Sequence, residues 1–433
     1  MNQLRKKNGI RSLTALAPVI LALLAFGCEA PTDNTQTDRP TSGKQKELKL
    51  GTLLPTTGDL SSIGQNMPKA VELAVETINA CEGVNGANVI VINEDSQTDP
   101  NAGISAMTKL AEVDRVAGVI GAFASSVSTA AVDIAVRNEI MMISPGSTSP
   151  VFTRDAKDGI FKGYWARTVS SDTYQAGGLA ALAAKQGFNR VSTIVINNDY
   201  GVGFEEAFIE SFTKVGGKMV QGYDPVRYDP KAATLDSEAK AAFAGNPDAV
   251  VAVLYTETGS VLVRSAFEQG LTNNVTFLLT DGVYSPDFVR QAGKSDGKSI
   301  IAGALGTVAG ANGEGLADLT TKWKDKTGQE MAAYVAQSWD AAVLMMLAAE
   351  AADANTGEGI KSKIREVANA PGKEVSDPCE AIALVRNGED INYQGASGNV
   401  DIDENGDVVG SYDVWTVKED GTLEVIDTVK PVE

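Results

Sequence analysis

Two apolar segments in the first third of the chain each end in residues that can bind a small anion. The segment Val116–Ile120 runs into the small and hydroxyl residues of Gly121–Ser126, and the segment Ile140–Ile143 runs into the sequence SPGST. A helical pattern follows Ser125 and Ser126, and the N-terminus of a helix offers unpaired backbone N–H groups and a partial positive charge. These two loops could therefore hold a small carboxylate.

The same hydroxyl residues could instead serve only to cap local structure. Ser125, Ser126 and Thr148 are residue types that cap helices and stabilise turns. Either loop taken alone favours this simpler interpretation. The choice depends on whether the surrounding elements bring the two loops together.

Apolar segments of strand length alternate with helical patterns along most of the chain. The first run has expected strands at 47–54, 88–93, 116–120 and 140–143 and helices at 67–80, 101–113 and 127–137. The second run has strands at 191–196, 249–254 and 275–279 and helices at 174–186, 204–215 and 260–269. A strand at 300–305, helices at 334–352 and 360–369 and a short β-rich tail at 398–425 follow. This alternation predicts parallel sheets with helices on both faces, in which ligands bind beyond the carboxyl ends of the strands.

The length of the chain indicates more than one core. About 385 residues follow the N-terminal region, which is more than a single core usually organises. We expect an α/β protein of two doubly wound lobes, with a crossover near Arg167. The expected borders are 47–167 plus 303–395 for the first lobe and 168–302 plus 396–433 for the second.

The first 27 residues have the features of a bacterial export signal. The apolar stretch Leu13–Phe26 is too short to span a bilayer, and it follows four cationic residues, Arg5, Lys6, Lys7 and Arg11. Gly27 and Cys28 then resemble the end of a lipoprotein signal, in which the cysteine is lipidated and becomes the mature N-terminus. Residues 28–46 are rich in Pro, Thr, Asp, Gln and Ser and are expected to form a disordered tether. We therefore expect an exported protein, in the periplasm or at the cell surface, that a lipid anchors to a membrane.

The composition excludes several classes of function. Removing four of the 37 basic residues with the signal leaves 33 against 56 acidic residues, a net charge of −23, which disfavours nucleic acid as a partner. The chain contains no histidine, the commonest general base and transition-metal ligand, so serine-hydrolase triads and zinc centres are not expected. With Cys28 assigned to the lipid, Cys81 and Cys379 are predicted to form a disulfide in the exported protein.

Three short matches to enzyme or metal motifs each lack a required residue. The segment GVGFEE has Glu206 where a dinucleotide-binding fingerprint needs its third glycine. The segment DIDENGD begins like a calcium-binding loop, but Tyr412 stands where the bidentate glutamate is needed. The segments SEAK, SDG and KTG, at 237–240, 295–297 and 326–328, follow the order of β-lactamase motifs, but the second lacks its asparagine. We expect no enzyme, no cofactor and no metal site.

The ordered set of motifs resembles the substrate-binding proteins of branched-chain amino-acid ABC transporters. Between Leu48 and Trp415 it includes LLPTTGDLSSIG, INACEGVNG, EDSQTDP, VIGAFASSVSTAA, MMISPGSTSP, INNDYGVG, LLTDG and AQSWDAAVLMM. The resemblance implies the type I periplasmic-binding fold, in which three crossovers join two lobes and the ligand is caught in the cleft between them. It also implies an ABC-transporter permease as partner, and we expect a monomer.

The resemblance assigns candidate residues in the first lobe to a ligand carboxylate. The positions that bind the carboxylate in this family match Ser125, the backbone of Gly146, and Thr148, with Ser147 beside them. This assignment agrees with the anion site that the donor-rich loops suggest by themselves.

In the second lobe, the resemblance assigns Asp281 to the ligand ammonium group. Asp281 ends the segment TFLLTD, at the position of an acidic residue that receives the ammonium in this family. A buried cation needs such a partner. Tyr200 and Tyr255 are candidates for the wall of the cleft, with ordinary packing within the lobe as the alternative.

The departures from the family pattern leave the ligand side chain open. Ile63 stands where some relatives have an aromatic residue over the ligand, and Asp281 is shorter than the glutamate of others. We expect a small α-amino acid, branched-chain or related, that is delivered to an ABC importer. The alternative is a sensing protein for an amino acid, an amide or a urea-like solute, without a role in transport.

The lipid anchor can be tested on Cys28. Replacement Cys28→Ala removes the only acceptor that the signal offers, so the variant should move from the membrane fraction to the soluble fraction on cell fractionation. A variant that stays with the membrane as the parent does would show that the anchor is not a lipid on Cys28.

Overall fold

The computed structural model describes residues 47–220 and 222–429, and the predicted export signal, tether and Cys28 lie outside this range. Across the described ranges, no helix combines the length and apolar character that a membrane span requires. The described residues form two large β-sheets with helices on both faces of each.

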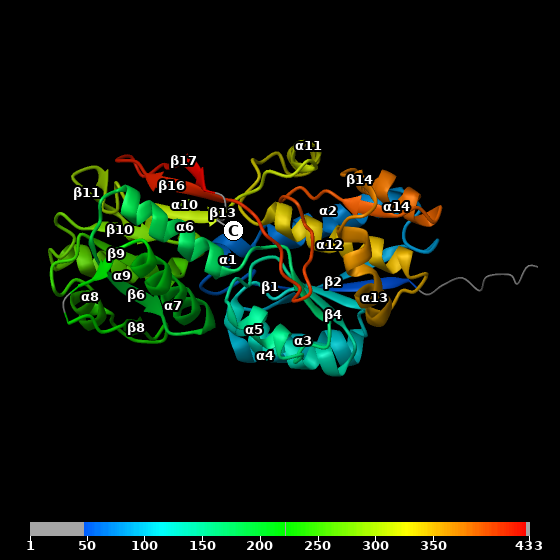
Figure 1. The fold of residues 1–433 in the computed structure, drawn as a ribbon, viewed down its shortest axis with the longest axis horizontal. Coiled ribbons are helices and arrows are strands. Elements are labelled where there is room, and N and C mark those ends of the chain that lie inside the picture. Colours follow the sequence, from blue (N-terminus) through cyan, green and yellow to red (C-terminus); the bar gives the residue numbers. More distant parts are fainter. Residues whose placement is uncertain (1–46, 221, 430–433) are drawn as a thin grey trace, which may run out of the picture. The chain divides into compact units, whose positions relative to one another are not determined.

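The first sheet is entirely parallel and has the strand order β2-β1-β3-β4-β5. Its strands are β1 (Leu48–Leu54), β2 (Val89–Asp95), β3 (Gly118–Gly121), β4 (Met141–Ser144) and β5 (Trp165–Arg167). One face is covered by α3 (Pro100–Thr108) and α4 (Ser125–Arg137), and the other by α2 (Met67–Ala80) and α12 (Val335–Ala351) (Figure 1). This arrangement confirms the doubly wound lobe that the sequence predicts.

Helix α12 is buried along almost its whole length. It packs against α2, α13 (Gly357–Ala368) and α14 (Pro378–Arg386) as well as against the sheet. Its sequence VAQSWDAAVLMMLAAEA has apolar or small residues on every side, which is typical of a helix that is surrounded by protein.

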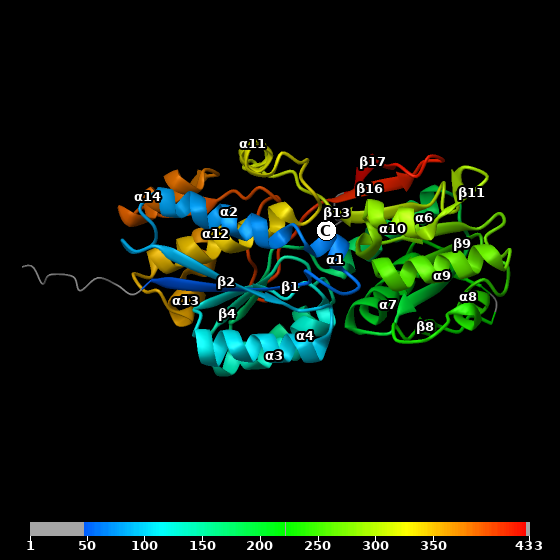
Figure 2. The same cartoon turned by 180° about the vertical axis from the view of Figure 1, so that it is seen from behind.

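The second sheet has a parallel centre and an antiparallel edge (Figure 2). The parallel strands are β6 (Arg190–Ile196), β9 (Ala249–Val253), β10 (Thr276–Leu279) and β13 (Leu305–Ala309), with the short β7 (Lys218–Met219) and β8 (Val226–Tyr228) beside β6. The antiparallel strands are β16 (Tyr412–Val417) and β17 (Leu423–Val429). The covering helices are α6 (Asp172–Lys185) and α7 (Asp199–Lys214), and α8 (Asp236–Ala242), α9 (Thr256–Glu268) and α10 (Pro286–Ala292).

Shorter elements complete the chain. They are α1 (Ser61–Gly64), η1 (Lys109–Asp114), α5 (Val151–Lys157), η2 (Asp281–Val283), β11 (Lys294–Ser295), β12 (Lys298–Ser299), α11 (Leu316–Thr327), β14 (Lys373–Val375) and β15 (Ile391–Tyr393). Most expected elements are present, with ends that differ by a few residues.

Two expected borders are wrong. Residues 300–304 form no strand because the chain turns at Gly303, whose φ is +82°, and the strand β13 that follows belongs to the second sheet. Residues 396–409, assigned to the second lobe, instead pack apolar side chains into the core of the first sheet, among them Ala396, Val400, Ile402 and Val408. We therefore place 47–167 and 310–409 in the first lobe and the remaining described residues in the second.

Three segments connect the two sheets, at 168–171, 310–315 and 394–411, and α12 contacts all of them. The carbonyl of Gln337 accepts from the Thr168 hydroxyl (2.8 Å), and the Gln337 amide donates to the Gly310 carbonyl (3.0 Å). The Asp340 carboxylate accepts the backbone N–H groups of Ala396 (2.9 Å) and Ser397 (2.7 Å). Burial raises the pKa of Asp340 to about 6, with these hydrogen bonds acting in the opposite direction.

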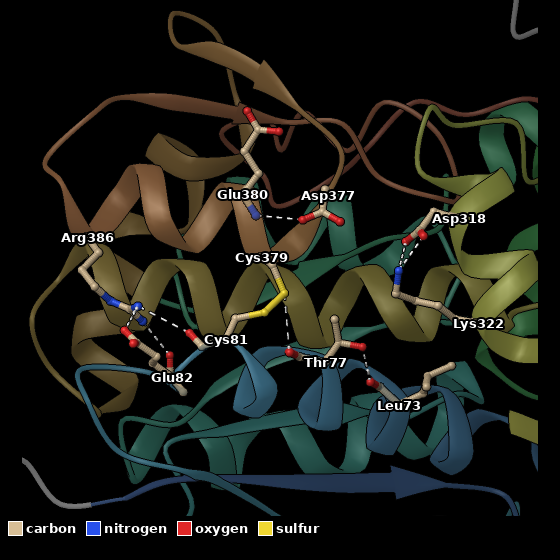
Figure 3. Close-up of a disulfide and its surroundings, with 11 residues drawn as sticks. Leu73, Thr77, Cys81, Glu82, Asp318, Lys322, Asp377, Cys379, Glu380 and Arg386 are labelled. Carbon is tan, nitrogen blue, oxygen red and sulfur yellow. Dashed lines mark hydrogen bonds and ion pairs between the residues drawn. A yellow bond between two sulfur atoms is a disulfide. The ribbon is translucent and has the colours of Figure 1, made fainter. Parts of the chain in front are cut away.

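A disulfide closes the far end of the first lobe (Figure 3). Cys81 follows the last residue of α2, Cys379 is the second residue of α14, and their bonded sulfurs place the Cα atoms 5.6 Å apart. Arg386 of α14 also donates to the Gly83 carbonyl (2.9 Å), so an ordinary hydrogen bond supports the same junction. Since α2 runs antiparallel to the strands, this junction lies near the amino ends of the strands, opposite the carboxyl ends at which ligands bind in such sheets.

The disulfide should stabilise the exported protein, because it links residues 298 positions apart and restricts the unfolded chain. We expect reductant to lower the free energy of unfolding by about 2–5 kcal/mol in a urea titration. The control is a Cys81→Ser, Cys379→Ser protein, whose stability should not respond to reductant. Intact mass after alkylation without reductant checks the bond itself, and two alkylated thiols on the exported protein would contradict it.

Candidate functional site

The carboxyl ends of β3 and β4 bring the two donor-rich loops together. Helix α4 opens at Ser125, and its N-cap residue, Ala124, provides no side-chain acceptor for the first backbone N–H groups. The Ser125 hydroxyl oxygen accepts the backbone N–H of Ser149 in the second loop (3.3 Å). An uncapped helix N-terminus beside a hydroxyl is suited to an anionic group.

Inside the second loop, two predicted donors are already engaged. The backbone N–H groups of Gly146 (3.2 Å) and Ser147 (2.8 Å) both donate to the Ser144 hydroxyl oxygen. The Ser147 hydroxyl lies within hydrogen-bond distance of the Ala122 (3.1 Å) and Phe123 (3.0 Å) carbonyls. The Gly146 N–H, predicted to receive a ligand carboxylate, donates within its own loop in this arrangement, and Ser147 holds the loop.

Gly146 has a steric role instead. A Cβ atom at this position would lie 2.1 Å from the ring of Phe123. The ring occupies the space that any side chain at residue 146 would need, so a glycine is required for Phe123 to reach the cavity.

Arg167 fixes the same loop from behind. Its guanidinium donates to the carbonyls of Ser147 (3.0 Å) and Ser149 (3.2 Å), and its charge is paired with Asp407 (2.7 Å). The Arg167 side chain is fully buried. Such a buried charge is tolerated only with a close partner and satisfied donors.

The second lobe contributes two tyrosines and a carboxylate from the carboxyl ends of β6, β9 and β10. The rings of Tyr200 and Tyr255 are stacked, with centroids 5.8 Å apart and an interplanar angle of 10°. Asp281 begins the turn after β10. Gly282 follows it, and a Cβ there would lie 2.4 Å from the Leu254 carbonyl, so the close approach of this turn to β9 requires glycine.

Asp281 is buried and held by three donors. They are the hydroxyls of Tyr200 (2.7 Å) and Tyr334 and the amide of Gln175 (3.2 Å). Burial raises the pKa of Asp281 above its ordinary value, and these hydrogen bonds offset part of that effect.

A second carboxylate, Asp172, is buried in the same region without a hydrogen-bond partner among the described residues. Burial raises its pKa well above the ordinary value, and the nearby charge of Asp281 raises it further. The hydroxyl of Thr148 and the charge of Arg167 act in the opposite direction, although the hydroxyl does not reach hydrogen-bond geometry. Asp172 thus has a deficit of positive charge that a ligand can supply.

Two residues of this region, Asp172 and Tyr334, are not among the predicted ligand residues. Ser171 is the N-cap of α6, and Asp172 is the first helical residue. Tyr334 has a φ of +66°, and its ring meets Phe123 edge to face at 4.8 Å. A left-handed conformation at a tyrosine is unfavourable and persists only where tertiary contacts hold it.

The first and second lobes enclose a small cavity at these residues. It holds about 230 Å³ of space between atoms. Leu60 and Phe123 line it together with five of the seven predicted ligand residues, Ser125, Gly146, Tyr200, Tyr255 and Asp281. The other two, Ser147 and Thr148, are buried outside the lining.

A larger groove, with about 1620 Å³ of space between atoms, lies elsewhere, over α5 and the 399–409 segment. Exposed side chains of both signs, such as Arg154, Asp158 and Asp403, line it. The smaller cavity is the better candidate, because the buried carboxylate of Asp281 lines it and five of the predicted ligand residues meet there.

Comparison with known proteins identifies relatives over nearly the whole described chain. A family model described as the receptor family ligand binding region matches residues 66–420. Leu/Ile/Val-binding protein homolog 2 of Brucella abortus is 29% identical over 336 residues, which cover 74% of this chain and 82% of that protein. The chemotactic signal transduction system substrate-binding protein BasB of Halobacterium salinarum is 25% identical over 366 residues, 82% of this chain and 83% of that protein.

Solved structures share the fold over 89% of this chain. The leucine-binding protein LivK of Thermotoga maritima has a TM-score of 0.74 with 26% identity, and 99% of it is covered. A solute-binding protein of an ABC transporter from R. palustris, in complex with 4-hydroxybenzoate, has a TM-score of 0.71 with 18% identity and 98% covered. The fold is therefore the type I periplasmic-binding fold, and proteins that share it bind chemically different ligands.

Proposed function

Because the chain belongs to the receptor family ligand binding region, whose substrate-binding members are not enzymes, we propose that it captures a small α-amino acid by closing its two lobes and delivers it to an ABC importer. The related Leu/Ile/Val-binding protein homologues and LivK support the amino-acid class. The expected partners are the permease and a membrane that the lipid on Cys28 reaches.

The observation that carries this proposal is the pairing of two buried carboxylates with an uncapped helix N-terminus in one region. Asp172 and Asp281 lie on the second-lobe side, and α4 opens at Ser125 on the first-lobe side. An α-amino acid has one cationic and one anionic group bonded to the same carbon atom, so it fits both. An aromatic acid would bring a further negative charge to the carboxylates without a cation to compensate them.

Each lobe then holds one charged group of the ligand. In the first lobe, Ser125, the first N–H groups of α4 and Thr148 receive the carboxylate. In the second lobe, Asp281 receives the ammonium, and Asp172, at the start of the second lobe, shares it. Leu60, Phe123, Tyr200 and Tyr255 line the cavity with largely apolar surface, which favours an aliphatic side chain on the ligand.

Closure follows from this division of the charges. An open protein can satisfy only the carboxylate or only the ammonium, whereas the closed protein satisfies both. The ligand therefore binds the closed state more tightly and shifts the equilibrium toward it.

Sensing is the second candidate function. BasB, named as a component of a chemotactic signal transduction system, aligns over most of its length. The same capture and closure would serve a receptor as well as a permease. Loss of amino-acid uptake in a strain that lacks the protein would support transport, whereas intact uptake with lost chemotaxis would support sensing.

Asp281→Ala tests the assignment of the ammonium site. Removal of one partner of a buried charged contact costs about 2–5 kcal/mol, or about thirtyfold to several thousandfold in affinity. We expect this loss in a calorimetric titration with the best amino acid from a thermal-shift screen. Thr148→Ala should lose less, because the donors at the start of α4 remain.

The matched control is Asp287→Ala, which removes a carboxylate whose side chain is 40% exposed and lies on α10. It should bind within about twofold of the parent. An Asp281→Ala protein that also bound within a few-fold would mean that the ligand is not held as an α-amino acid, and an amide, a urea-like solute or an organic acid would replace it.

Asp172→Asn tests the second carboxylate by separating affinity from stability. The change removes one of two buried like charges, so the ligand-free protein should unfold at a higher temperature while amino-acid affinity falls at least about tenfold. A protein with a raised unfolding temperature and unchanged affinity would show that Asp172 does not contact the ammonium.

The same pair predicts the pH dependence. Burial raises the pKa of Asp172 and of Asp281 in the folded protein. Both carboxylates therefore become protonated at a higher pH than an ordinary aspartate does. As the pH falls through these raised values, amino-acid affinity should decrease and the stability of the ligand-free protein should increase. Asp172→Asn should make both dependences shallower in titrations and melts between neutral and acidic pH.

A further inference from the structure

The N-terminus of helix α9 in the second lobe is capped by a residue of the first lobe. The carboxylate of Asp59 accepts the backbone N–H groups of Glu257 (2.6 Å) and Thr258 (3.1 Å) and the hydroxyl of Thr258 (2.6 Å). The helix's own N-cap residue, Tyr255, makes no side-chain cap bond. Asp59, in the first lobe, therefore accepts the hydrogen bonds that a helix's own N-cap residue usually accepts.

The loop that carries Asp59 is held in place within the first lobe. The Asp95 carboxylate accepts the backbone N–H groups of Thr56 (3.0 Å) and Thr57 (3.2 Å). Gly58 has a φ of +83°, and a Cβ there would lie 2.1 Å from the Gln97 carbonyl. These constraints fix the acceptor before it meets α9, so little conformational entropy is lost when the contact forms.

Two weaker contacts lie beside this cap. The hydroxyls of Ser62 in α1 and Thr256 in α9 are 3.1 Å apart, and Lys231 pairs with Asp99 at 3.3 Å. The Lys231 side chain is 78% exposed, so this ion pair contributes little. Asp59, with three charge-assisted hydrogen bonds, is the strongest polar contact in this group.

The cap and the ligand cavity share the same end of α9. Tyr255 directly precedes the helix, lines the cavity and stacks on Tyr200, which binds Asp281. Separation of the lobes would return Asp59 and the N–H groups of α9 to water. The bonds between them therefore belong to the closed state alone.

We propose that Asp59 is a positioning residue that closes the lobes over the ligand by capping α9, and that it sets ligand affinity without touching the ligand. This inference rests on the proposed function, because it assigns a further determinant of the same capture step. It predicts that loss of the cap acts on ligand release, since release requires the lobes to open.

The test compares Asp59→Ala and Asp59→Asn in the full mature chain. Asp59→Ala should weaken binding by about two- to thirtyfold, the factor that the loss of an N-cap produces, through faster dissociation and with little change in association. Asp59→Asn should retain most of the affinity, because asparagine caps helices about as well as aspartate. The control Lys231→Met, which removes the exposed ion pair, should stay within about twofold.

The ligand for the kinetic measurement is whichever of the twenty standard amino acids gives the largest thermal shift, and stopped-flow fluorescence gives its rates. Small-angle X-ray scattering provides a second readout that needs no ligand. The ligand-free Asp59→Ala protein should have a larger radius of gyration than the parent, and saturation with the amino acid should make the two radii equal. A merely structural role would lower the unfolding temperature without changing dissociation.

Failure of this inference can be distinguished from failure of the proposed function. Dissociation rates and ligand-free radii of Asp59→Ala equal to those of the parent would overturn the role of Asp59 and leave the amino-acid function intact. If no amino acid binds the parent, the proposed function fails. The scattering comparison of the ligand-free proteins then decides the role of Asp59, and equal radii of gyration would refute that role.

Discussion

The burial of two carboxylates, Asp172 and Asp281, in one region is the constraint on which the rest of the site depends. Each raises the cost of charging the other, and water is excluded from both. Tyr200, Tyr334 and Gln175 stabilise Asp281 but leave Asp172 without a partner. The charge of Arg167 offsets only part of the cost of burying Asp172, and in the proposed function the ligand ammonium offsets more of it.

Helix α12 contacts Asp281 and all three segments that connect the two lobes. Tyr334 at its N-terminus binds Asp281, Gln337 contacts the first two crossovers, and Asp340 holds the third. The helix itself is buried within the first lobe and cannot shift independently of its neighbours. The proposed closure would then be a rotation of the second lobe against α12, with the crossovers as hinges.

The comparisons explain why the fold alone does not name the ligand. Structural neighbours include a leucine-binding protein and a protein in complex with 4-hydroxybenzoate. Both kinds of ligand carry a carboxylate, so the helix N-terminus at Ser125 would suit either one. An amino acid carries an ammonium group that 4-hydroxybenzoate lacks. In the proposed function, the buried carboxylates of the second lobe select for that group.

Periodicity and family motifs, which are local in the chain, predicted the alternation of strands and helices and five of the residues that line the cavity. The number of cysteines in an exported protein predicted the pairing of Cys81 with Cys379. It misplaced β13 because residues 300–302 are as apolar as a strand and only the turn at Gly303 excludes one. It described Tyr334 only as part of a helix, because the residues that its side chain contacts, Asp281 and Phe123, lie far away in sequence. The same holds for Asp59 and the helix nearly two hundred residues later that it caps: which donors remain free, and which charges remain unpaired, is decided only when the lobes pack together.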